Sequence, residues 1–523
     1  MFKFSVSIGI YSYLIFFLGI TGQLFKNHIF IVSLLYWVFF IFYFFKPGQV
    51  IFLNKKVINR ISAVCIFLLG VMFVVNLVGV LGPEISFDAL WYHLTLPKLY
   101  LINHAVFHIP GSLLYYSDMP KLTEMIYVAA LSFGDEFFAK LIHFTFGVLI
   151  LFPIYKISRK FFSQELSLLA TLIFYSNLVV GWESMASYSD LSRTFFEIMG
   201  FWAFIKAYEI KSKKWLLYSG ALLGFAISAK LLATGSILIF ICLLVIFFSK
   251  SFKDFLVNFI SLTLPAVIIP LPWFIFSYIN TGNPIYPFFD SRINLQLQDS
   301  SNLIEKILNI FLFSSDPISP VYLIVLPILF FLFKNASAKV RLLYIYSLGA
   351  LIILLLTPNI GGGRFILAYL PVFSILAIYA LRIQINLAKS ILLLIIFLII
   401  FSSIGYRFLA NFKFVPVIVG NETKAEFLSN HLNFKFGDFY DTDSFFKNNI
   451  YKSDKVLLYG FHNLYYVNFP FIHSSWIKKG DKFNYIAFQD SKLPKRFLSW
   501  ELVYYNKITG VKPYSNKKQL CTY

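Results

Sequence analysis

Charged side chains are scarce in this chain of 523 residues: only 13% are Asp, Glu, Lys or Arg, and 59% are hydrophobic. A water-soluble protein of ordinary composition has about 25% charged residues, because its surface must be solvated. The low charge and a mean hydropathy of +0.74 exclude an ordinary soluble protein. They indicate a surface that mostly faces lipid.

Cysteine is also scarce, since the three residues Cys65, Cys242 and Cys521 lie far apart and two of them sit inside apolar runs. This set allows neither a disulfide framework nor the paired spacing of a zinc site. No small-residue processing site follows the first apolar run, so we interpret Phe4 onward as a membrane span. The formal net charge of +20 is assigned to cytoplasmic loops and a basic tail, and no nucleic acid partner is expected.

Long apolar runs dominate what is present. A run must cross roughly 30 Å of hydrocarbon to span a bilayer. The stretch 215–249 is too long for one span and is broken at Ala229-Lys230, so it is interpreted as two. The count predicts an all-α polytopic membrane protein with about thirteen transmembrane helices. The other runs are 4–24, 29–45, 62–82, 137–155, 167–185, 192–210, 255–279, 318–333, 342–358, 364–381 and 390–408.

Lys and Arg gather in alternate connections between these runs. Together with Lys3, that set holds 18 basic residues against three acids, whereas thirteen acids lie on the other side before residue 409. Cytoplasmic loops carry the excess of Lys and Arg. We therefore predict a cytoplasmic N-terminus in a plasma or inner membrane. With an odd number of spans, the C-terminal tail is extracytoplasmic.

Composition divides the chain into three parts. Residues 1–60 form two N-terminal transmembrane helices, and 61–408 form a membrane core with a long outer loop, 83–136. The tail 409–523 is polar and basic, with 16 Lys and Arg against 9 Asp and Glu. It predicts a small α/β or α+β domain. Its expected elements are a helix near 422–432 and strands at 455–459 and 485–488, and a helix along the interface is expected at 121–133.

Asp88 stands just after the third span, among aromatic residues and a histidine. A carboxylate in a cleft at the membrane edge can act as a general base toward an acceptor hydroxyl. The alternative is that Asp88 caps a helix beginning at Ala89. Polar groups at membrane depth are costly, and by default they mark a site. The acids on the outer side therefore place the expected function at the outer face.

Several motifs occur in an order that resembles the GT-C glycosyltransferases. These are polyprenyl-phosphate-sugar-dependent membrane enzymes that include protein O-mannosyltransferases and the lipid A aminoarabinose transferase. The resemblance covers roughly 61–408 and the start of the tail. Many relatives carry an acidic pair at the first motif, whereas Ala89 follows Asp88 here. The matching elements are Asp88-x-x-x-Tyr92, Pro97-Lys98, Phe133-Gly134, Asp190, Trp215 to Gly220 with Gly224 and Lys230, Pro272-Trp273, Thr281 to Pro287, and Arg364-Phe365 with Pro371.

The resemblance implies an inverting glycosyltransferase that moves a sugar from an outward-facing polyprenyl-phosphate donor to a hydroxyl on a glycan, lipid or protein. Asp88 would be the base, and it stays open whether Asp190 or Glu183 shares the catalytic role. Tyr92 and His93 would contact substrate. No metal ligand set and no cofactor besides the lipid-linked donor are predicted.

Two cations on the outer side, Lys230 and Arg364, could hold the donor phosphate. Around Arg364, the N–H groups of Gly361-Gly362-Gly363 could join the guanidinium. The alternative for both cations is snorkelling to the headgroups, and the alternative for Asp190 is a helix cap before Leu191.

Two other functions use comparable membrane proteins. A flippase or transporter for a lipid-linked sugar would place charges at mid-span and show related halves, and neither feature is evident. A polymerase or ligase of surface polysaccharide would rely on outer arginines, of which Arg193, Arg292, Arg364 and Arg407 are available before the tail.

Overall fold

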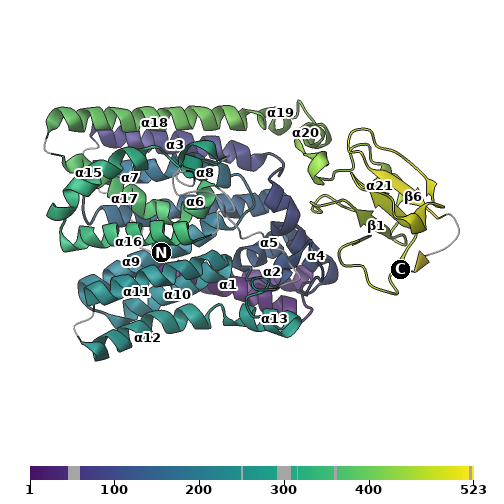
Figure 1. Ribbon diagram of the computed structural model, residues 1–523, viewed down its shortest axis with the longest axis horizontal. Coiled ribbons are helices and arrows are strands. Elements are labelled where there is room, and N and C mark those ends of the chain that lie inside the picture. The colour runs from purple at the N-terminus through teal and green to yellow at the C-terminus, as the bar shows by residue number, and fades with distance from the viewer. Residues whose placement is uncertain are drawn as a thin grey trace.

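The computed structural model is an elongated molecule with a helical bundle at one end and a small sheet domain at the other (Figure 1). It describes residues 1–44, 59–248, 251–290, 305, 308–314, 316–357, 362–383, 385–516 and 521–522. The predicted class, a helical membrane part followed by a small C-terminal domain with a sheet, is confirmed.

Seven helices of the described residues are long and apolar enough to cross a membrane alone, and one further pair, α12 and α13, qualifies together with a bend of 49°. The predicted spans all coincide with helix, but several are shorter or broken, so thirteen crossings remain a prediction. The bundle consists of α1 (Phe2–Ile20), α2 (Lys26–Phe44), α3 (Arg60–Leu81), α6 (Glu136–Ser158), α7 (Gln164–Tyr175), α8 (Leu178–Glu183), α9 (Asp190–Ile210), α10 (Lys213–Ala229), α11 (Thr234–Phe248), α12 (Phe252–Ile268), α13 (Leu271–Thr281), α15 (Val321–Leu332), α16 (Ala338–Leu356), α17 (Leu370–Tyr379) and α18 (Asn386–Phe412).

The break predicted within 215–249 is present. Helix α10 ends at Ala229, Lys230 is extended, and a 3-10 turn, η3 (Leu231–Ala233), leads into α11. Small residues bring α10 against α12, because a Cβ on Gly220 would lie 1.9 Å from the carbonyl oxygen of Leu262. Such backbone contact is typical of helix packing in membranes, where small residues permit close approach. The break places Lys230 beside the start of α9.

The outer loop is packed between the bundle and the sheet domain (Figure 1). The helix expected at 121–133 is present, but it is buried among α1, α4 and α6, whereas we predicted that it lies along the interface. The loop elements are η1 (Ala89–His93, a π-helical turn), α4 (Thr95–Asn103), η2 (Tyr115–Asp118) and α5 (Leu122–Phe133).

The C-terminal domain contains a five-stranded mixed sheet in the order β2-β1-β4-β6-β5. The two strands expected from the sequence, β1 (Val456–Tyr459) and β4 (Tyr485–Phe488), are parallel neighbours at its centre. The expected helix is α20 (Lys424–His431), which begins with a capping box of Thr423 and Glu426. The remaining elements are α19 (Val415–Ile418), α21 (Phe445–Asn449), β2 (Phe471–His473), β3 (Lys482–Phe483), β5 (Glu501–Leu502), β6 (Lys512–Ser515) and β7 (Cys521–Thr522), which pairs with β3.

The sheet domain is attached to the outer loop by buried polar contacts. The ammonium of Lys98 donates to the carbonyl oxygens of Tyr465 and Val467, each at 2.6 Å, and the hydroxyl of Tyr466 donates to the carbonyl of Glu84 at 2.9 Å. The ring of His462 stacks on Phe87 at 4.9 Å. The domain therefore supports the segment that carries Asp88.

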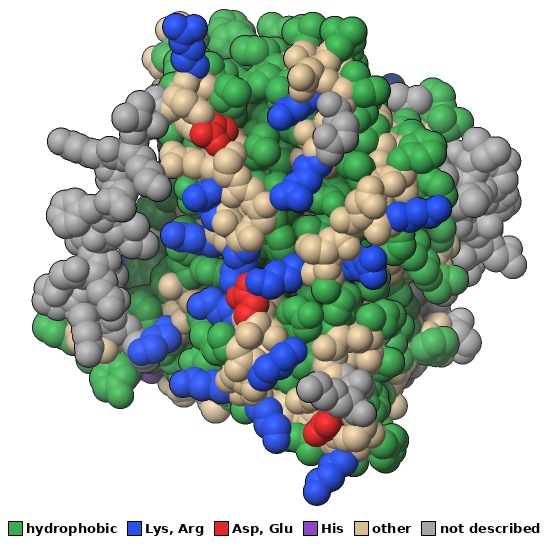
Figure 2. All heavy atoms as spheres, turned by 90° about the vertical axis from the view of Figure 1, so that its left-hand side faces the viewer, with side chains coloured by type: hydrophobic (Ala, Val, Ile, Leu, Met, Phe, Trp, Pro, Cys, Tyr) green, Lys and Arg blue, Asp and Glu red, His purple; other side chains and the backbone are tan. Residues whose placement is uncertain are grey.

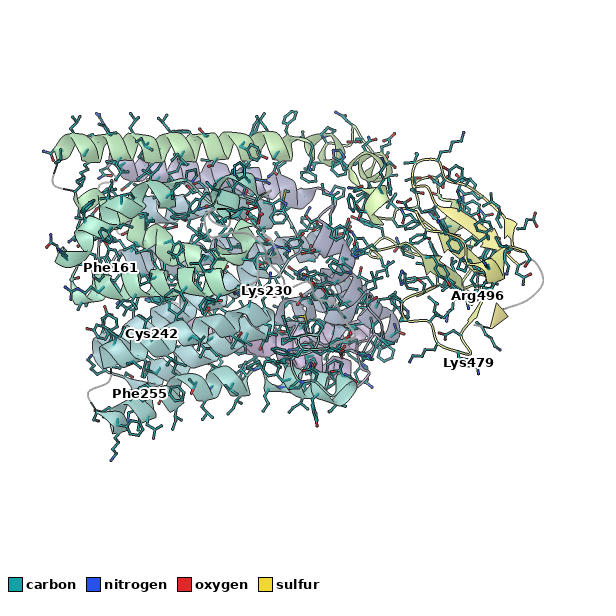
Figure 3. The ribbon with its side chains drawn as sticks, viewed as in Figure 1. Phe161, Lys230, Cys242, Phe255, Lys479 and Arg496 are labelled. Atoms are coloured by element: carbon teal, nitrogen blue, oxygen red, sulfur yellow. The ribbon has the colours of Figure 1, made fainter. Side chains whose placement is uncertain are left out.

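Basic side chains crowd the end of the bundle opposite the sheet domain (Figure 2). Figure 3 places Phe161 at this end and Lys230 nearer to the sheet domain. Ion pairs of Glu209 with Lys160 and, at 3.4 Å, with Lys339 join loops that are distant in sequence. The predicted basic loops thus share one end, although Lys46, Lys55, Lys56 and Lys250 lie outside the described residues.

Candidate functional site

Asp88 and Arg364, which are 276 positions apart in the sequence, form an ion pair. The guanidinium Nη1 lies 2.6 Å from the Asp88 carboxylate oxygen Oδ2, and both side chains are partly accessible. Asp88 occupies the N-cap position of η1, as the capping alternative expected, but its side chain makes no capping hydrogen bond. The Asp88 backbone N–H instead donates to the hydroxyl of Tyr188 at 3.3 Å.

The backbone of Arg364 is held by Asp316. The Arg364 N–H donates to Asp316 Oδ2 at 2.9 Å, and the Gly363 N–H donates to the Asp316 carbonyl at 3.1 Å. A Cβ on Gly362 would lie 2.0 Å from Asp316 Oδ1, which explains the glycine. The N–H groups of Gly363 and Arg364 are therefore engaged, contrary to our expectation that the glycine turn leaves them free. Gly361 lies outside the described residues.

Asp190 and Lys230 form a second ion pair, at 2.6 Å between Oδ1 and Nζ. The carboxylate is buried and the ammonium is partly accessible, with 19% of its side chain exposed. Asp190 is the first residue of α9, and the capping position belongs to Ser189, so the capping interpretation of Asp190 is wrong. The break after α10 positions Lys230 for this contact.

One cavity of about 170 Å³ collects four of the six predicted site residues, namely Tyr92, His93, Lys230 and Arg364. The predicted acids, Asp88 and Asp190, contact the two predicted cations of its lining, Arg364 and Lys230 respectively. Six residues from η1, α9, the α10–α11 break and the segment before α17 are therefore brought together.

Two charged lining residues of this cavity, Lys121 and Glu124, were not among the predicted site residues. Glu124 Oε1 is 2.5 Å from Nδ1 of His93. The Lys121 ammonium donates to the carbonyl of Ser117 at 2.7 Å and lies over the ring of Trp273. Burial lowers the pKa of Lys121 to about 7, against the opposing effect of nearby acids. Lys121 and Glu124 lie one helical turn apart at the start of α5, and this spacing was the sequence signal that could have identified them.

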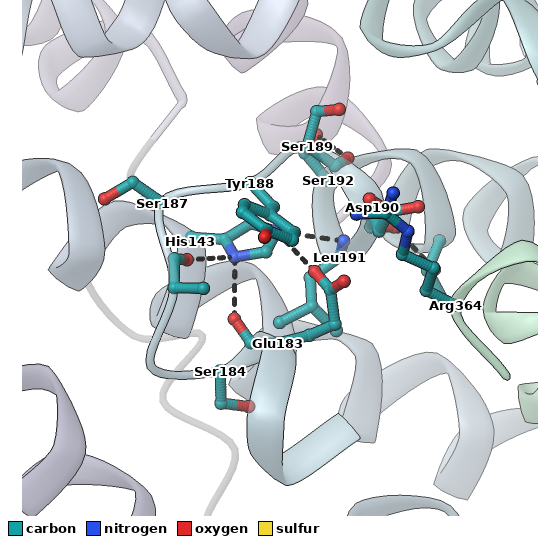
Figure 4. Close-up of polar contacts among 12 residues, drawn as sticks. His143, Glu183, Ser184, Ser187, Tyr188, Ser189, Asp190, Leu191, Ser192 and Arg364 are labelled. Atoms are coloured by element: carbon teal, nitrogen blue, oxygen red, sulfur yellow. Dashed lines mark hydrogen bonds and ion pairs between the residues drawn. The ribbon is translucent and has the colours of Figure 1, made fainter. Parts of the chain in front are cut away.

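Glu84 and Glu183 are further buried acids around the site. Glu84 accepts N–H groups from Ser86 and Ser187 at 2.9 and 2.8 Å, which ties the Asp88 loop to the segment before α9. Figure 4 shows Glu183 with His143 on one side of Asp190 and Arg364 on the other. Glu183 Oε2 is 3.9 Å from His143 Nε2, and the residue does not line the cavity.

Among the described residues, no group of three or more His, Cys, Asp and Glu side chains has an arrangement that could hold a metal ion. The cavity instead presents three cationic side chains, Lys121, Lys230 and Arg364, and one acid, Glu124. Such a lining suits an anionic group such as a phosphate.

The helical bundle, its packed outer loop and the appended sheet domain define the GT-C fold, as the sequence motifs predicted. In particular, the chain aligns with the crystal structure of ArnT from Cupriavidus metallidurans bound to undecaprenyl phosphate. The TM-score is 0.59 at 12% identity, over 87% of this chain and 98% of that chain. The apo form of the same protein gives 0.55 at 11% identity with the same coverage. These identities show the shared fold alone.

Other comparisons are more distant. The archaeal oligosaccharyltransferase AglB from Archaeoglobus fulgidus, in complex with an inhibitory peptide and a dolichol-phosphate, aligns with a TM-score of 0.47 and 12% identity over 86% of this chain and 74% of that chain. Residues 125–305 match a family described as a domain of unknown function (DUF8201). No curated protein sequence matches the chain.

Proposed function

We propose that this protein is an integral membrane glycosyltransferase that moves a sugar from an outward-facing polyprenyl-phosphate donor to a hydroxyl acceptor. The observation that carries the proposal is the pairing of Asp88 with Arg364 and of Asp190 with Lys230 around one cavity. The GT-C fold, shared with a protein crystallised with undecaprenyl phosphate, supports it.

Asp88 is the general base of this reaction. Its carboxylate removes the proton of the acceptor hydroxyl while the acceptor oxygen forms a bond to the anomeric carbon of the sugar. The bond between that carbon and the phosphate oxygen breaks on the opposite face, so configuration inverts. The polyprenyl phosphate leaves as a stable anion, and the step needs no general acid.

The cations bind the phosphate of the donor. Arg364 can offer a planar fork to two phosphate oxygens, which a lysine cannot do. In the structure its Nη1 engages Oδ2 of Asp88 at 2.6 Å. We infer that an arriving phosphate takes over part of the guanidinium and leaves the Asp88 carboxylate free to act as a base.

Asp190 acts on the same phosphate through Lys230. Its Oδ1 holds the Lys230 ammonium at the cavity wall, while Asp190 itself is 2% exposed. A carboxylate so little accessible cannot readily reach an acceptor hydroxyl. We therefore assign Asp190 the orientation of Lys230, and Asp88 the proton transfer.

A panel of polyprenyl-phosphate sugars, offered to membranes that contain the protein together with glycan, lipid and protein hydroxyl acceptors, tests the function. We expect one donor to be consumed with release of polyprenyl phosphate, and Asp88→Asn to lower the rate at least about a hundredfold, since an amide cannot accept the proton. The matched control is Asp254→Asn, at an exposed acid in the first turn of α12. Consumption of no donor, or an Asp88→Asn rate within a few-fold of the wild type, would contradict the proposal.

A further inference from the structure

A second cavity, of about 630 Å³, lies on the C-terminal domain, away from the residues of the membrane site. Its walls come from three segments of that domain, at 434–435, 488–492 and 505–512. Four of its lining residues are lysines and one is an acid, Asp490. The lysines are Lys435, Lys492, Lys507 and Lys512. We call this cavity the lysine cleft.

The lysine cleft opens where the central parallel strand β4 ends, because Phe488 is the last residue of β4 and Asp490 to Lys492 follow it. In sheets with parallel strands, ligands bind in the crevice outside the carboxyl ends of the strands. The neighbouring strand β1 is followed by Gly460, with φ at +79°, and a Cβ there would lie 1.8 Å from the carbonyl oxygen of Gln489. The two strand ends are therefore closely packed beneath the cleft.

A single buried side chain holds the three walls together. The amide nitrogen of Gln489 donates to the carbonyl oxygens of Asp438, at 2.7 Å, Phe434, at 3.1 Å, and Thr509, at 3.3 Å. Gln489 is 1% exposed, and its Oε1 has no hydrogen-bond partner within the described residues. The cleft is thus a constructed cavity with fixed walls, and its lysines do not simply lie scattered on a surface.

The charge of the cleft is only partly compensated, by Asp490 and by the ring of Tyr505, over which Lys512 lies at 5.2 Å. None of the four lysines forms an ion pair in the described part of the chain, and gathering like charges around one hollow is unfavourable until an anion enters. Two aromatic rings with accessible surface, those of Phe434 and Tyr505, share the lining, whereas the ring of Phe488 is buried and stacks on Tyr459. Aromatic faces provide rigid, amphipathic contact area, which suits the apolar face of a sugar ring. Cations beside such rings therefore favour a charged saccharide.

We propose that the lysine cleft binds an anionic glycan, that is, a saccharide bearing carboxylate or phosphate groups. The site is separate from the proposed transfer centre, and its occupancy does not depend on transferase activity. A flat, anionic membrane surface fits a concave site poorly, and the sheet domain projects beyond the end of the bundle (Figure 1).

Binding is measured on the purified full-length chain by titration calorimetry at low ionic strength. The probes are an oligogalacturonate, a phosphorylated oligomannose and an uncharged dextran oligosaccharide of equal length. We expect at least one charged probe to bind at least about tenfold more tightly than dextran. The double variant Lys507→Gln/Lys512→Gln should weaken that binding about tenfold or more, since hydrogen bonds between an ammonium and an anion are stronger than those between neutral groups.

Two variants separate specific binding from general charge and from misfolding. Lys478→Gln/Lys479→Gln removes the same charge from exposed lysines of the same domain outside the cleft, and it should leave affinity within about twofold. Asp490→Asn removes the acid from the cleft and should strengthen binding about twofold. Asn tolerates the left-handed conformation of Asp490, whose φ is +44°. A damaged fold would not strengthen binding.

The proposal is overturned if dextran binds as tightly as both charged probes, if the control pair loses as much affinity as the cleft pair, or if Asp490→Asn weakens binding. It is also overturned if vesicles of phosphatidylglycerol bind through Lys507 and Lys512 while neither charged saccharide does. In that case the cations would serve lipid headgroups. The oligogalacturonate carries carboxylates and the oligomannose carries phosphates, so comparing their affinities shows which kind of anionic glycan the cleft prefers.

Discussion

At the scale of single residues, Arg364 connects the Asp88 loop with the segment that Asp316 anchors. Its guanidinium reaches Asp88 from a backbone that Asp316 anchors, and 21% of its side chain is exposed. This geometry differs from snorkelling, in which a long basic side chain extends to the headgroups. The side chain is instead directed at an acid of the outer loop and at the cavity.

We expect Arg364→Lys to raise the donor KM about tenfold, and Arg364→Ala to raise it further. A lysine keeps the charge but loses the bidentate fork, and a hydrogen bond to a charged group contributes about 1.5–3 kcal/mol. The measurement is transfer rate against donor concentration in reconstituted membranes. Arg382→Lys, at an exposed arginine near the opposite end of the bundle, should have no effect. A lysine variant with the wild-type KM would favour snorkelling.

Lys121 predicts a pH dependence. Because burial lowers its pKa to about 7, its charge is present below pH 7 and is lost as the pH rises through that value. The value of kcat/KM for the donor, which reports groups of the free enzyme, should therefore fall above about pH 7. In Lys121→Met the profile should be low and flat over the same range. If the fall of kcat/KM above about pH 7 persisted unchanged in Lys121→Met, the titration of another group would cause it.

At the scale of elements, the contact between α10 and α12 depends on Gly220. We expect Gly220→Leu to lower the melting temperature of the detergent-solubilised protein by about 1–3 °C, because a side chain there meets the Leu262 backbone and overpacking costs about 1–3 kcal/mol. Gly70→Leu on α3, where no atom lies within 4 Å of the added Cβ, is the control and should change it little. Equal melting temperatures for both variants would show that α12 can move without loss.

At the scale of the whole molecule, charge predicts the orientation in the membrane. The basic loops share one end of the bundle, and the sheet domain occupies the other (Figures 1 and 2). Because cytoplasmic loops carry the excess of Lys and Arg, reporters fused after residue 50 and after residue 520 should report the cytoplasm and the opposite compartment, respectively. Reporters in the same compartment would contradict both the odd number of spans and the external sheet domain.

The structure shows which elements of the fold could be predicted from local patterns in the sequence. Long apolar runs located the helices, and short strand-like runs at 455–459 and 485–488 located the central strands β1 and β4, because both signals are local and follow from burial. The number of membrane spans follows less directly from the apolar runs, because some runs contain local breaks. Helix α7 is followed by a break at Asn177, and α10 has only 17 residues, which hydropathy alone does not reveal.

Patterns along the chain predicted the helical membrane fold with its small sheet domain, which the structure confirms, and they also supplied the predicted sidedness and the six predicted site residues. Which of these residues contact each other follows from the packing of the folded chain. Asp88 meets Arg364 and Asp190 meets Lys230 through contacts 276 and 40 positions apart, and Lys121 and Glu124 join them because α5 packs inside the molecule. Ion pairs depend on distance in space, and distance in space is set by how helices and loops pack. Hydropathy and charge along the chain report burial and sidedness, and they carry no information about which buried charges face each other.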